Sequence, residues 1–360
     1  MRIQGIKIKG FRNLKVVDLT FEEGVPIHAF VGSNGQGKTN ILEAIYLCSL
    51  SKSFRTRTNS DLVGFEEEFS SVKVDTDNEK LEVIVTARPA QKVLKVNGLK
   101  KSAPEFIGNM RAVFFSPDDL ASMSFAPKLR RRYLDIVLSQ LNRGYLDKLM
   151  DYNDACRQRN SLLKAIAEGR ADTDELEFWD EKLAQLGSFI AQEREDLINH
   201  LQELVRRHYR EISKSDAEVT IVYESEVRGV KPKELGDLYR NGRRRDLAVC
   251  QTRLGPHRDD LKFLLGGKDM AFFASRGEWR SLVLALKFAE IDLIRERTGD
   301  DPILLLDDVF SELDAERQKY LFNATGKSQT FLTTTHREFI DALPAAHTVY
   351  RVDGGLIVSS

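Results

Sequence analysis

A glycine-rich segment near the start of the chain constrains the fold more than any other feature. Residues 32–39 read GSNGQGKT, which fits the pattern G-x-x-x-x-G-K-[ST] of a phosphate-binding loop. An apolar run at 27–31 precedes the motif and predicts a buried strand, and helix-forming residues at 40–47 follow it. A strand, a loop and a helix in this register favour a phosphate cradle over a turn that merely reverses the chain.

The chemistry of such a loop follows from its backbone. Glycines allow successive N–H groups to point at phosphate oxygens, and the helix that follows adds the positive end of its dipole. We expect Lys38 to reach the β- and γ-phosphates of a nucleotide, and the Thr39 hydroxyl to hold Mg²⁺. The candidate nucleotide-binding residues of the loop are Gly32, Ser33, Asn34, Gly35, Gln36, Gly37, Lys38 and Thr39.

A short acidic motif lies near the other end of the chain. Residues 303–306 are apolar, and Asp307 and Asp308 follow them directly. A buried strand would deliver Asp307 to the Mg²⁺ ion, and Asp308 could orient or deprotonate the attacking water. The alternative is a core strand that ends in a solvated acidic turn, which the phosphate-binding loop disfavours. Together the two motifs predict binding of ATP or GTP, with hydrolysis.

Most of the chain separates these two motifs. A βα unit takes only about 30 residues, so a large insertion must lie between the two halves of one sheet. Apolar residues recur at helical spacing over 128–167 and over 174–212, which indicates a helical insertion. Ser116 and Pro117, with Asp118 and Asp119 after them, predict the start of a helix at its beginning.

These observations predict an α/β protein with two lobes. Lobe I, an ATPase head with a mixed β-sheet, would comprise residues 1–115 and 251–360. Lobe II, residues 116–250, would be inserted and mostly helical.

Strand-like composition returns after the insertion. Residues 218–223 are rich in β-branched side chains, and the runs 261–265 and 270–273 flank Gly266-Gly267, which predicts a β-hairpin. A Ser-x-Gly element, Ser275 to Gly277, then opens a predicted helix. Its N-terminus could bind a second anion, or Ser275 could be an ordinary N-cap with nothing bound, and the element alone favours the N-cap.

Further motifs occur in one order along nearly the whole chain. They are GFRNL at 10–14, FSPDDL at 115–120, LGPHRDDL at 254–261, LLLDDVFSELD at 304–314 and TTTH at 333–336. In this order, together with the phosphate-binding loop and the Ser-x-Gly helix, they resemble the RecF family within the SMC class of ABC-type ATPases.

The resemblance implies roles that spacing alone does not assign. Ser275 and Gly277 would contact the nucleotide of a second protomer, so that ATP would join two chains head to head. Asp314 would couple the two sites, and His336 would sense the γ-phosphate. Asp308 stands where ABC ATPases commonly carry the longer Glu, which implies slow turnover.

The complete expected site combines both kinds of inference. The catalytic set would be Lys38, Asp307, Asp308 and His336, with Thr39 and Asp307 holding Mg²⁺. Arg12 and Asn13 are candidates for contacts with adenine. The chain departs from the family at Glu278, where Gln is usual after Ser-x-Gly, and this puts the strength of dimerisation in question.

The resemblance also implies a function. ATP binding would drive formation of a homodimer on duplex or gapped DNA, and a weak, DNA-stimulated ATPase would release it. Such a switch acts in recombinational repair and replication-fork maintenance, where it helps to load recombinase at single-strand gaps. RecR is the implied protein partner, with RecO as a further candidate.

Charge alone does not mark a nucleic-acid-binding protein. The net charge is −1 and the pI is about 6.6, but basic residues concentrate in particular segments. A single run of this kind is more often a solvated helix face than a binding site. The candidate DNA contacts are Lys7, Lys9, Lys52, Arg55, Arg57, Arg243, Arg244 and Arg245.

The remaining composition excludes several classes of protein. Cys48, Cys156 and Cys250 are isolated, which supports neither a zinc site nor a disulfide framework. The N-terminus does not read as a signal peptide, and no apolar run approaches a membrane span, so we expect a cytoplasmic protein. Two other functions remain open: the ATPase subunit of a transporter, and a scaffold that binds ATP without useful hydrolysis.

Overall fold

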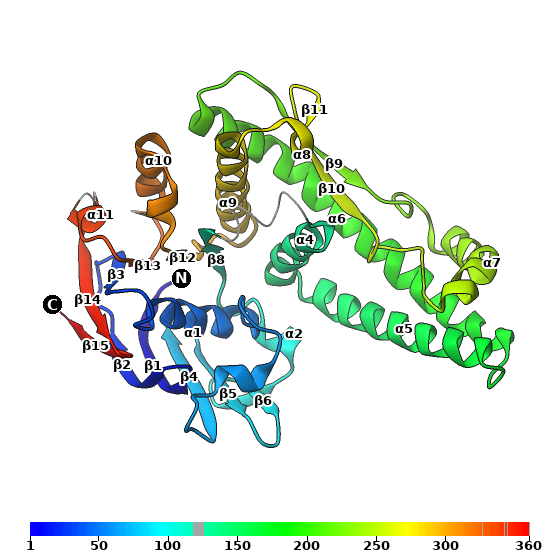
Figure 1. The fold of residues 1–360 in the computed structure, drawn as a ribbon, viewed down its shortest axis with the longest axis horizontal. Coiled ribbons are helices and arrows are strands. Elements are labelled where there is room, and N and C mark those ends of the chain that lie inside the picture. Colours follow the sequence, from blue (N-terminus) through cyan, green and yellow to red (C-terminus); the bar gives the residue numbers. More distant parts are fainter. Residues whose placement is uncertain (118–125, 326, 342, 344, 360) are drawn as a thin grey trace.

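The computed structural model describes residues 1–117, 126–325, 327–341, 343 and 345–359. Within them the chain forms two lobes (Figure 1), one built on two six-stranded sheets and the other around long helices. The predicted α/β class with a mixed sheet and a mostly helical second lobe is confirmed. The helix start predicted at Ser116 and Pro117 continues into Asp118 and Asp119, which lie outside the described residues.

A largely parallel sheet positions both halves of the expected nucleotide site. Its strand order is β15-β14-β3-β13-β12-β8, with the strands from β14 to β8 parallel and β15 antiparallel. β3 (Ile27–Val31) and β12 (Ile303–Asp307) are interior strands, which is why both are mostly apolar and do not alternate with polar residues. Both end at the same edge of the sheet, so the phosphate-binding loop and the acidic motif meet there. The other strands are β8 (Ala112–Phe115), β13 (Thr330–Thr334), β14 (His347–Asp353) and β15 (Leu356–Ser359).

Helix α1 (Lys38–Leu50) lies between this sheet and a second, antiparallel sheet. It contacts both sheets, and nearly all of its residues are buried. A helix covered on two faces needs no amphipathic stripe, and the sequence at 40–50 is accordingly apolar all round. The second sheet consists of β1 (Ile3–Phe11), β2 (Leu14–Thr20), β4 (Phe69–Thr76), β5 (Lys80–Thr86), β6 (Gln91–Val96) and β7 (Leu99–Lys101).

The helical lobe is organised around α6 (Leu176–Ser213), a helix of 38 residues. Its apolar face packs against other helices of the lobe and against α9, which leads back to β12. A small sheet of order β11-β10-β9 also lies in this lobe. The helices are α4 (Pro127–Leu141), α5 (Arg143–Ala167), α7 (Pro232–Val249), α8 (Met270–Phe273) and α9 (Arg276–Thr298), and the strands are β9 (Val219–Glu224), β10 (Asp260–Leu265) and β11 (Lys268–Asp269).

Shorter elements connect these parts or cover the sheet edge. They are the helices α2 (Ala103–Phe106), α10 (Ala315–Thr325) and α11 (Glu338–Asp341), and the 3-10 turns η1 (Asn59–Leu62), η2 (Thr173–Glu175) and η3 (Val309–Glu312). No described helix is both long enough and apolar enough to span a bilayer.

Two predicted elements differ from the structure. The helical segment over 128–167 is two helices, because Asn142 ends α4 and its side chain accepts a hydrogen bond from the Tyr145 N–H (3.2 Å) as the N-cap of α5. The second strand of the hairpin ends at Asp269, which caps α8, so residues 270–273 are helical and not extended. The boundary at residue 250 stays a proposal; β9 before it pairs with β10 after it.

A buried charge network joins the helices of the second lobe. The Arg159 side chain is fully buried on α5; it donates to Asp180 on α6 (2.7 Å) and to Asp246 on α7 (2.6 Å). Arg243 approaches Asp180 from the other side (2.7 Å). Buried carboxylates held in this way depend on their cations, since an unpaired buried charge is costly.

Replacing Arg159 with Met is therefore expected to lower the free energy of unfolding by about 3–5 kcal/mol, because it leaves the buried Asp246 without its cation and Asp180 with Arg243 alone. Denaturant titration followed by circular dichroism measures this change. Arg157→Met is the matched control, because Arg157 is exposed on the same helix and its surface ion pair with Asp154 contributes less than about 1 kcal/mol. Equal losses in the two variants would contradict a structural role for the network.

Candidate nucleotide site

The phosphate-binding loop runs from the end of β3 to the first residue of α1. Gly35 and Gly37 have φ angles of 81° and 109°, a conformation that side chains other than glycine rarely adopt. A Cβ on Gly37 would lie 2.7 Å from Oδ1 of Asn13, so a larger residue is excluded there on two grounds. The loop therefore has the backbone shape that the sequence motif predicts.

Lys38 is nearly buried, and its ammonium group fixes the loop from inside. Its Nζ donates to the carbonyl oxygens of Gly32 (2.7 Å) and Ser33 (2.8 Å). Burial lowers the pKa of Lys38, while the nearby Asp308 and Asp307 carboxylates oppose that shift. An ammonium group has three N–H donors, so one remains for a phosphate oxygen.

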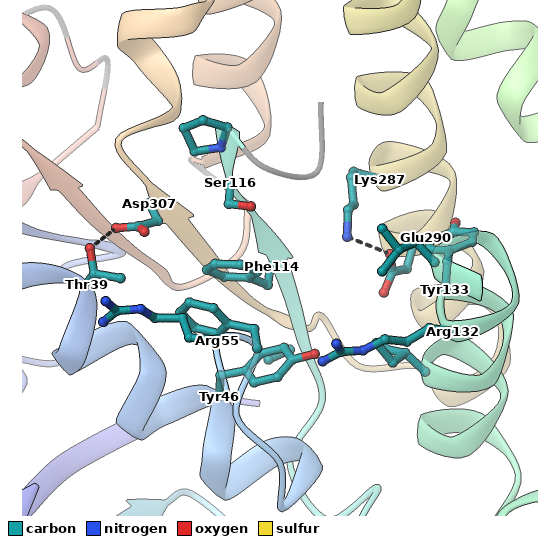
Figure 2. A pocket seen from close by; sticks show the side chains of 15 residues that line it. Thr39, Tyr46, Arg55, Phe114, Ser116, Arg132, Tyr133, Lys287, Glu290 and Asp307 are labelled. Atoms are coloured by element: carbon teal, nitrogen blue, oxygen red, sulfur yellow. Dashed lines mark hydrogen bonds and ion pairs between the residues drawn. The ribbon is translucent and has the colours of Figure 1, made fainter. Parts of the chain in front are cut away.

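Thr39 and Asp307, the expected Mg²⁺ ligands, lie in direct contact. The Thr39 hydroxyl donates to Oδ1 of Asp307 (2.8 Å), and the Thr333 hydroxyl on β13 donates to the same atom (2.7 Å). Figure 2 shows the Thr39 and Asp307 side chains facing each other at the edge of a cavity. Hydroxyl and carboxylate oxygens suit Mg²⁺, which typically takes one or two protein ligands and completes its shell with phosphate and water.

The described residues contain no cluster of three or more His, Cys, Asp or Glu that could hold a metal ion without help.

Asp308 has an unusual backbone and a half-buried carboxylate. Its φ angle is 50°, and its N–H donates to the Thr333 hydroxyl (3.0 Å). Burial raises the pKa of Asp308 and Asp307 adds to the shift, whereas Lys38 and His336 oppose it. Oδ1 of Asp308 is buried and accepts no hydrogen bond from the described residues. An acceptor in this position can take a hydrogen bond from a water molecule.

His336 follows β13, close enough for its charge to act on Asp308. Its N–H donates to the Thr334 hydroxyl (3.0 Å), and its ring packs edge-on against Phe339 with 5.6 Å between centroids. The predicted catalytic set of Lys38, Asp307, Asp308 and His336 is thus gathered at one edge of the sheet.

The two residues predicted to contact adenine have strong partners inside the protein. The Arg12 guanidinium donates two hydrogen bonds, of 3.0 and 2.7 Å, to Glu43, a fully buried acid on α1. Asn13 donates to the carbonyl oxygen of Gln36 (3.2 Å) and accepts a hydrogen bond from Asn40 (2.7 Å). Both residues hold the loop and α1 in place, and contact with a base stays a prediction.

The C-terminal hairpin also holds the loop, which the sequence did not indicate. The N–H groups of Gly354 and Gly355 donate to Oε1 (2.5 Å) and to the carbonyl oxygen (2.9 Å) of Gln36. A Cβ on Gly355 would lie 2.2 Å from the Asn13 carbonyl oxygen, so this turn must come close. A Gly-Gly turn was the available signal, but nothing in the sequence links it to residue 36.

Ser275, Gly277 and Asp314 form a second cluster, at the N-terminus of α9. The Ser275 hydroxyl accepts from the Glu278 N–H (3.3 Å), and Glu278 accepts from the Ser275 N–H (2.7 Å), which is a reciprocal capping box. Arg317, a residue that sequence reasoning missed, donates to the Gly277 carbonyl oxygen (3.0 Å) and pairs with Asp314. Glu278, at the position where the family usually has Gln, therefore completes a helix cap.

The candidate DNA contacts lie in three separate places. Lys7 and Lys9 are exposed on β1, Lys52, Arg55 and Arg57 follow α1, and the arginines at 243–245 lie on α7 at the far end of the other lobe (Figure 1). Arg243 is held by Asp180 and Glu177 (2.7 and 2.6 Å), and Lys7 pairs with Asp18 (2.9 Å). The structure thus gives Arg243 a structural role and does not join these residues into one patch.

The fold and the site define an ABC-type ATPase head of the SMC class. The family described as RecF/RecN/SMC N terminal domain matches residues 2–357. The head domain of Smc from Pyrococcus furiosus has a similar fold, with a TM-score of 0.55 and 16% identity over 99% of this chain and 96% of that one.

Within this class the chain belongs to the RecF family. It is 39% identical over 368 residues to the DNA replication and repair protein RecF of Streptococcus suis (strain 05ZYH33), covering 100% of both. For RecF of Streptococcus pneumoniae (strain 70585) the identity is 38%, over 99% of this chain and 98% of that protein. A solved structure, the recombination mediator protein RecF with ATPrS in the RecFOR pathway, superposes with a TM-score of 0.91 at 36% identity, covering 99% of this chain and 98% of that one.

Asp308→Asn is expected to raise the melting temperature by a few degrees near neutral pH, because a neutral amide avoids the burial of a carboxylate. The fold raises the pKa of Asp308, so the charged carboxylate destabilises the folded protein at pH values above that pKa. Protonation of the carboxylate at lower pH removes this destabilisation. The advantage of the variant should therefore shrink as the pH falls from about 7.5 towards about 3.9, the ordinary pKa of aspartate. Thermal melts across this range measure it, with the exposed Asp147→Asn as control; a pH-independent difference would contradict the assignment.

Proposed function

We propose that the protein is an ATP-gated DNA-binding switch of recombinational repair, in which ATP joins two chains head to head. The observation that carries this proposal is that the expected nucleotide contacts of one chain fall into two groups that do not line the same cavity. Thr39 and Asp307 line the cavity of Figure 2, whereas Ser275 and Gly277, at the start of α9, are not among its lining residues. A second copy can supply them through a two-fold interface, in which each chain completes the other's site.

Nucleotide binding would rest on the residues gathered at the sheet edge. The loop N–H groups and the remaining N–H of Lys38 would bind the phosphates, and Thr39 and Asp307 would hold Mg²⁺, which neutralises charge on the β- and γ-phosphates. The solved relatives described as RecF-ATP and RecF-ATPrS support ATP as the nucleotide.

Asp308 would orient the attacking water through its buried oxygen, next to His336. Slow hydrolysis would end the dimer, so that the enzyme acts as a weak, DNA-stimulated ATPase and a switch.

DNA would be held through its phosphates, without readout of sequence. The names of the relatives, DNA replication and repair protein and recombination mediator, support duplex and gapped DNA as the ligand. Such binding weakens as salt rises, because counterions are released from the DNA. The pathway named for the solved relative supports RecR and RecO as partners, and loading of recombinase at gaps as the outcome. Action on chromosomal DNA would place the protein in the cytoplasm.

Ser275→Asp tests the role of α9 in the partner's site. Aspartate is a good N-cap, so the helix should persist, but its charge would repel the triphosphate of the other chain. We expect an affinity for ATP within about twofold of wild type and loss of the ATP-dependent dimer in sedimentation velocity with a slowly hydrolysed ATP analogue. Ser161→Asp, at an exposed position on α5, should dimerise like wild type.

Lys38→Met completes the comparison, because loss of the ammonium group should abolish both nucleotide binding and dimerisation. Dimerisation of the Ser275→Asp variant, or of Lys38→Met, in the presence of ATP would refute the sandwich arrangement.

A further inference from the structure

A second cavity, of about 750 Å³, lies between the two lobes, and seven of its lining residues are lysine or arginine. One wall comes from the segment after α1 and from β6, and the opposite wall comes from α4. The cavity adjoins the one in Figure 2, because Tyr46, Arg132 and Ile136 line both. The basic residues of its lining that matter here are Lys52, Arg57, Lys92, Lys128, Arg131 and Arg132.

None of these six cations forms an ion pair with a carboxylate in the described part of the chain. Three of them donate to backbone carbonyl oxygens, which carry no net charge: Lys92 to Ser51 (2.6 Å), Arg131 to Asp259 (2.6 Å) and Arg132 to Ser53 (3.3 Å). Lys52, Arg57 and Lys128 form no ion pair with any described residue.

The one acid among the described lining residues is already bound elsewhere. Asp135 pairs with Arg194 (2.8 Å) and accepts a hydrogen bond from the Tyr145 hydroxyl (2.5 Å). It therefore offers little compensation to the cations on the opposite wall.

Burial and neighbouring cations both act on this group. The pKa of Lys92 is lowered, first by burial and then by the nearby Lys52. Burial together with Arg194 lowers the pKa of Arg131, although Asp260, Asp259 and Asp135 oppose that shift. Cations held together in this way gain from an anion that enters between them, because the anion relieves their mutual repulsion.

We propose that this interlobe cavity binds the phosphodiester backbone of an unpaired DNA strand. The inference rests on the proposed function and specifies where the single-stranded part of a gapped substrate would lie. A cavity of this size suits a ligand of one or two nucleotides, and a base-paired duplex, whose major groove alone is about 12 Å wide, does not fit. Free phosphate offers the same chemistry, so the test must separate the two sources.

The placement of the cavity gives the strand a defined effect. Lys92 belongs to the sheet lobe and Lys128 to the helical lobe, so a bound backbone would hold the lobes together. Arg132 lines the adjacent cavity on the side away from Thr39 and Asp307, so the strand would lead to the cavity that the expected Mg²⁺ ligands line.

Charge removal on both walls tests the proposal. In the double variant Lys92→Gln/Lys128→Gln, fluorescence anisotropy with ATP should give about tenfold weaker binding to a duplex with a single-stranded gap. The dependence of log K on log salt should become shallower by about 1.4, or 0.7 for each lost contact with a single strand. Blunt duplex should bind as to wild type, and inorganic phosphate at equal concentration should not compete with the gapped substrate.

Two matched proteins control for net charge and for local damage. Lys100→Gln/Lys233→Gln removes the same charge from exposed positions outside the cavity, one in each lobe, and should bind like wild type. Lys92→Arg/Lys128→Arg keeps the charge and should retain binding.

The outcomes separate this inference from the proposed function. If wild type itself fails to bind gapped DNA with ATP, the proposed function is wrong. The cavity is not a site for an unpaired strand if wild type binds gapped DNA and the Gln variant binds it equally well. The same conclusion follows if the Gln variant loses as much affinity for blunt duplex as for gapped DNA. Competition by inorganic phosphate alone would identify a simple anion site and overturn the assignment to DNA.

Discussion

One carboxylate oxygen holds the nucleotide site together. Oδ1 of Asp307 accepts hydrogen bonds from the Thr39 hydroxyl (2.8 Å) and the Thr333 hydroxyl (2.7 Å). These contacts join the first turn of α1 to two parallel strands that lie near the other end of the chain. Without them the phosphate-binding loop would be fixed to the sheet only through β3 and through the turn at Gly354 and Gly355. The position of Asp308 depends on the same junction, because its N–H donates to Thr333.

The buried charges next to this junction follow from its geometry. The parallel strands bring Lys38, Asp307 and Asp308 to one edge, where burial disfavours the charges of Lys38 and Asp308 and their opposite signs partly compensate. Such a site suits a polyanion that binds together with its cation. The second cluster, in which Arg317 joins Asp314 to Gly277, does not line the cavity that contains Thr39 and Asp307. Because of this separation, the simplest role for the Ser-x-Gly helix is to contact the nucleotide bound by a second chain.

Local patterns predicted much of this architecture. The GSNGQGKT loop, the apolar strand before Asp307 and the long amphipathic segment over 174–212 correspond to β3, α1, β12 and α6. The helix starts at Asn142 and Asp269 were missed. In each case a side chain caps the backbone and starts a new helix, although the spacing of apolar residues predicts that the preceding element continues, and tertiary contacts decide which of the two forms.

Contacts between distant segments could not be predicted from local patterns. Nothing in the sequence pairs Gln36 with the turn at Gly354 and Gly355, and nothing distinguishes Arg243, which is ion-paired and partly buried, from an exposed member of its arginine run. The interlobe cavity has the same origin, since its cations come from three segments that are far apart in the chain. Side-chain charge is visible in a sequence, but the partner that neutralises it is not.

The central claim is that ATP gates the interaction with DNA. The direct measurement is fluorescence anisotropy of a labelled duplex with a single-stranded gap, titrated with the wild-type protein in ATP, in ADP and without nucleotide. The account predicts tight, salt-sensitive binding with ATP alone. Equal binding under all three conditions would contradict it, and would mean that nucleotide chemistry and DNA binding are independent in this protein.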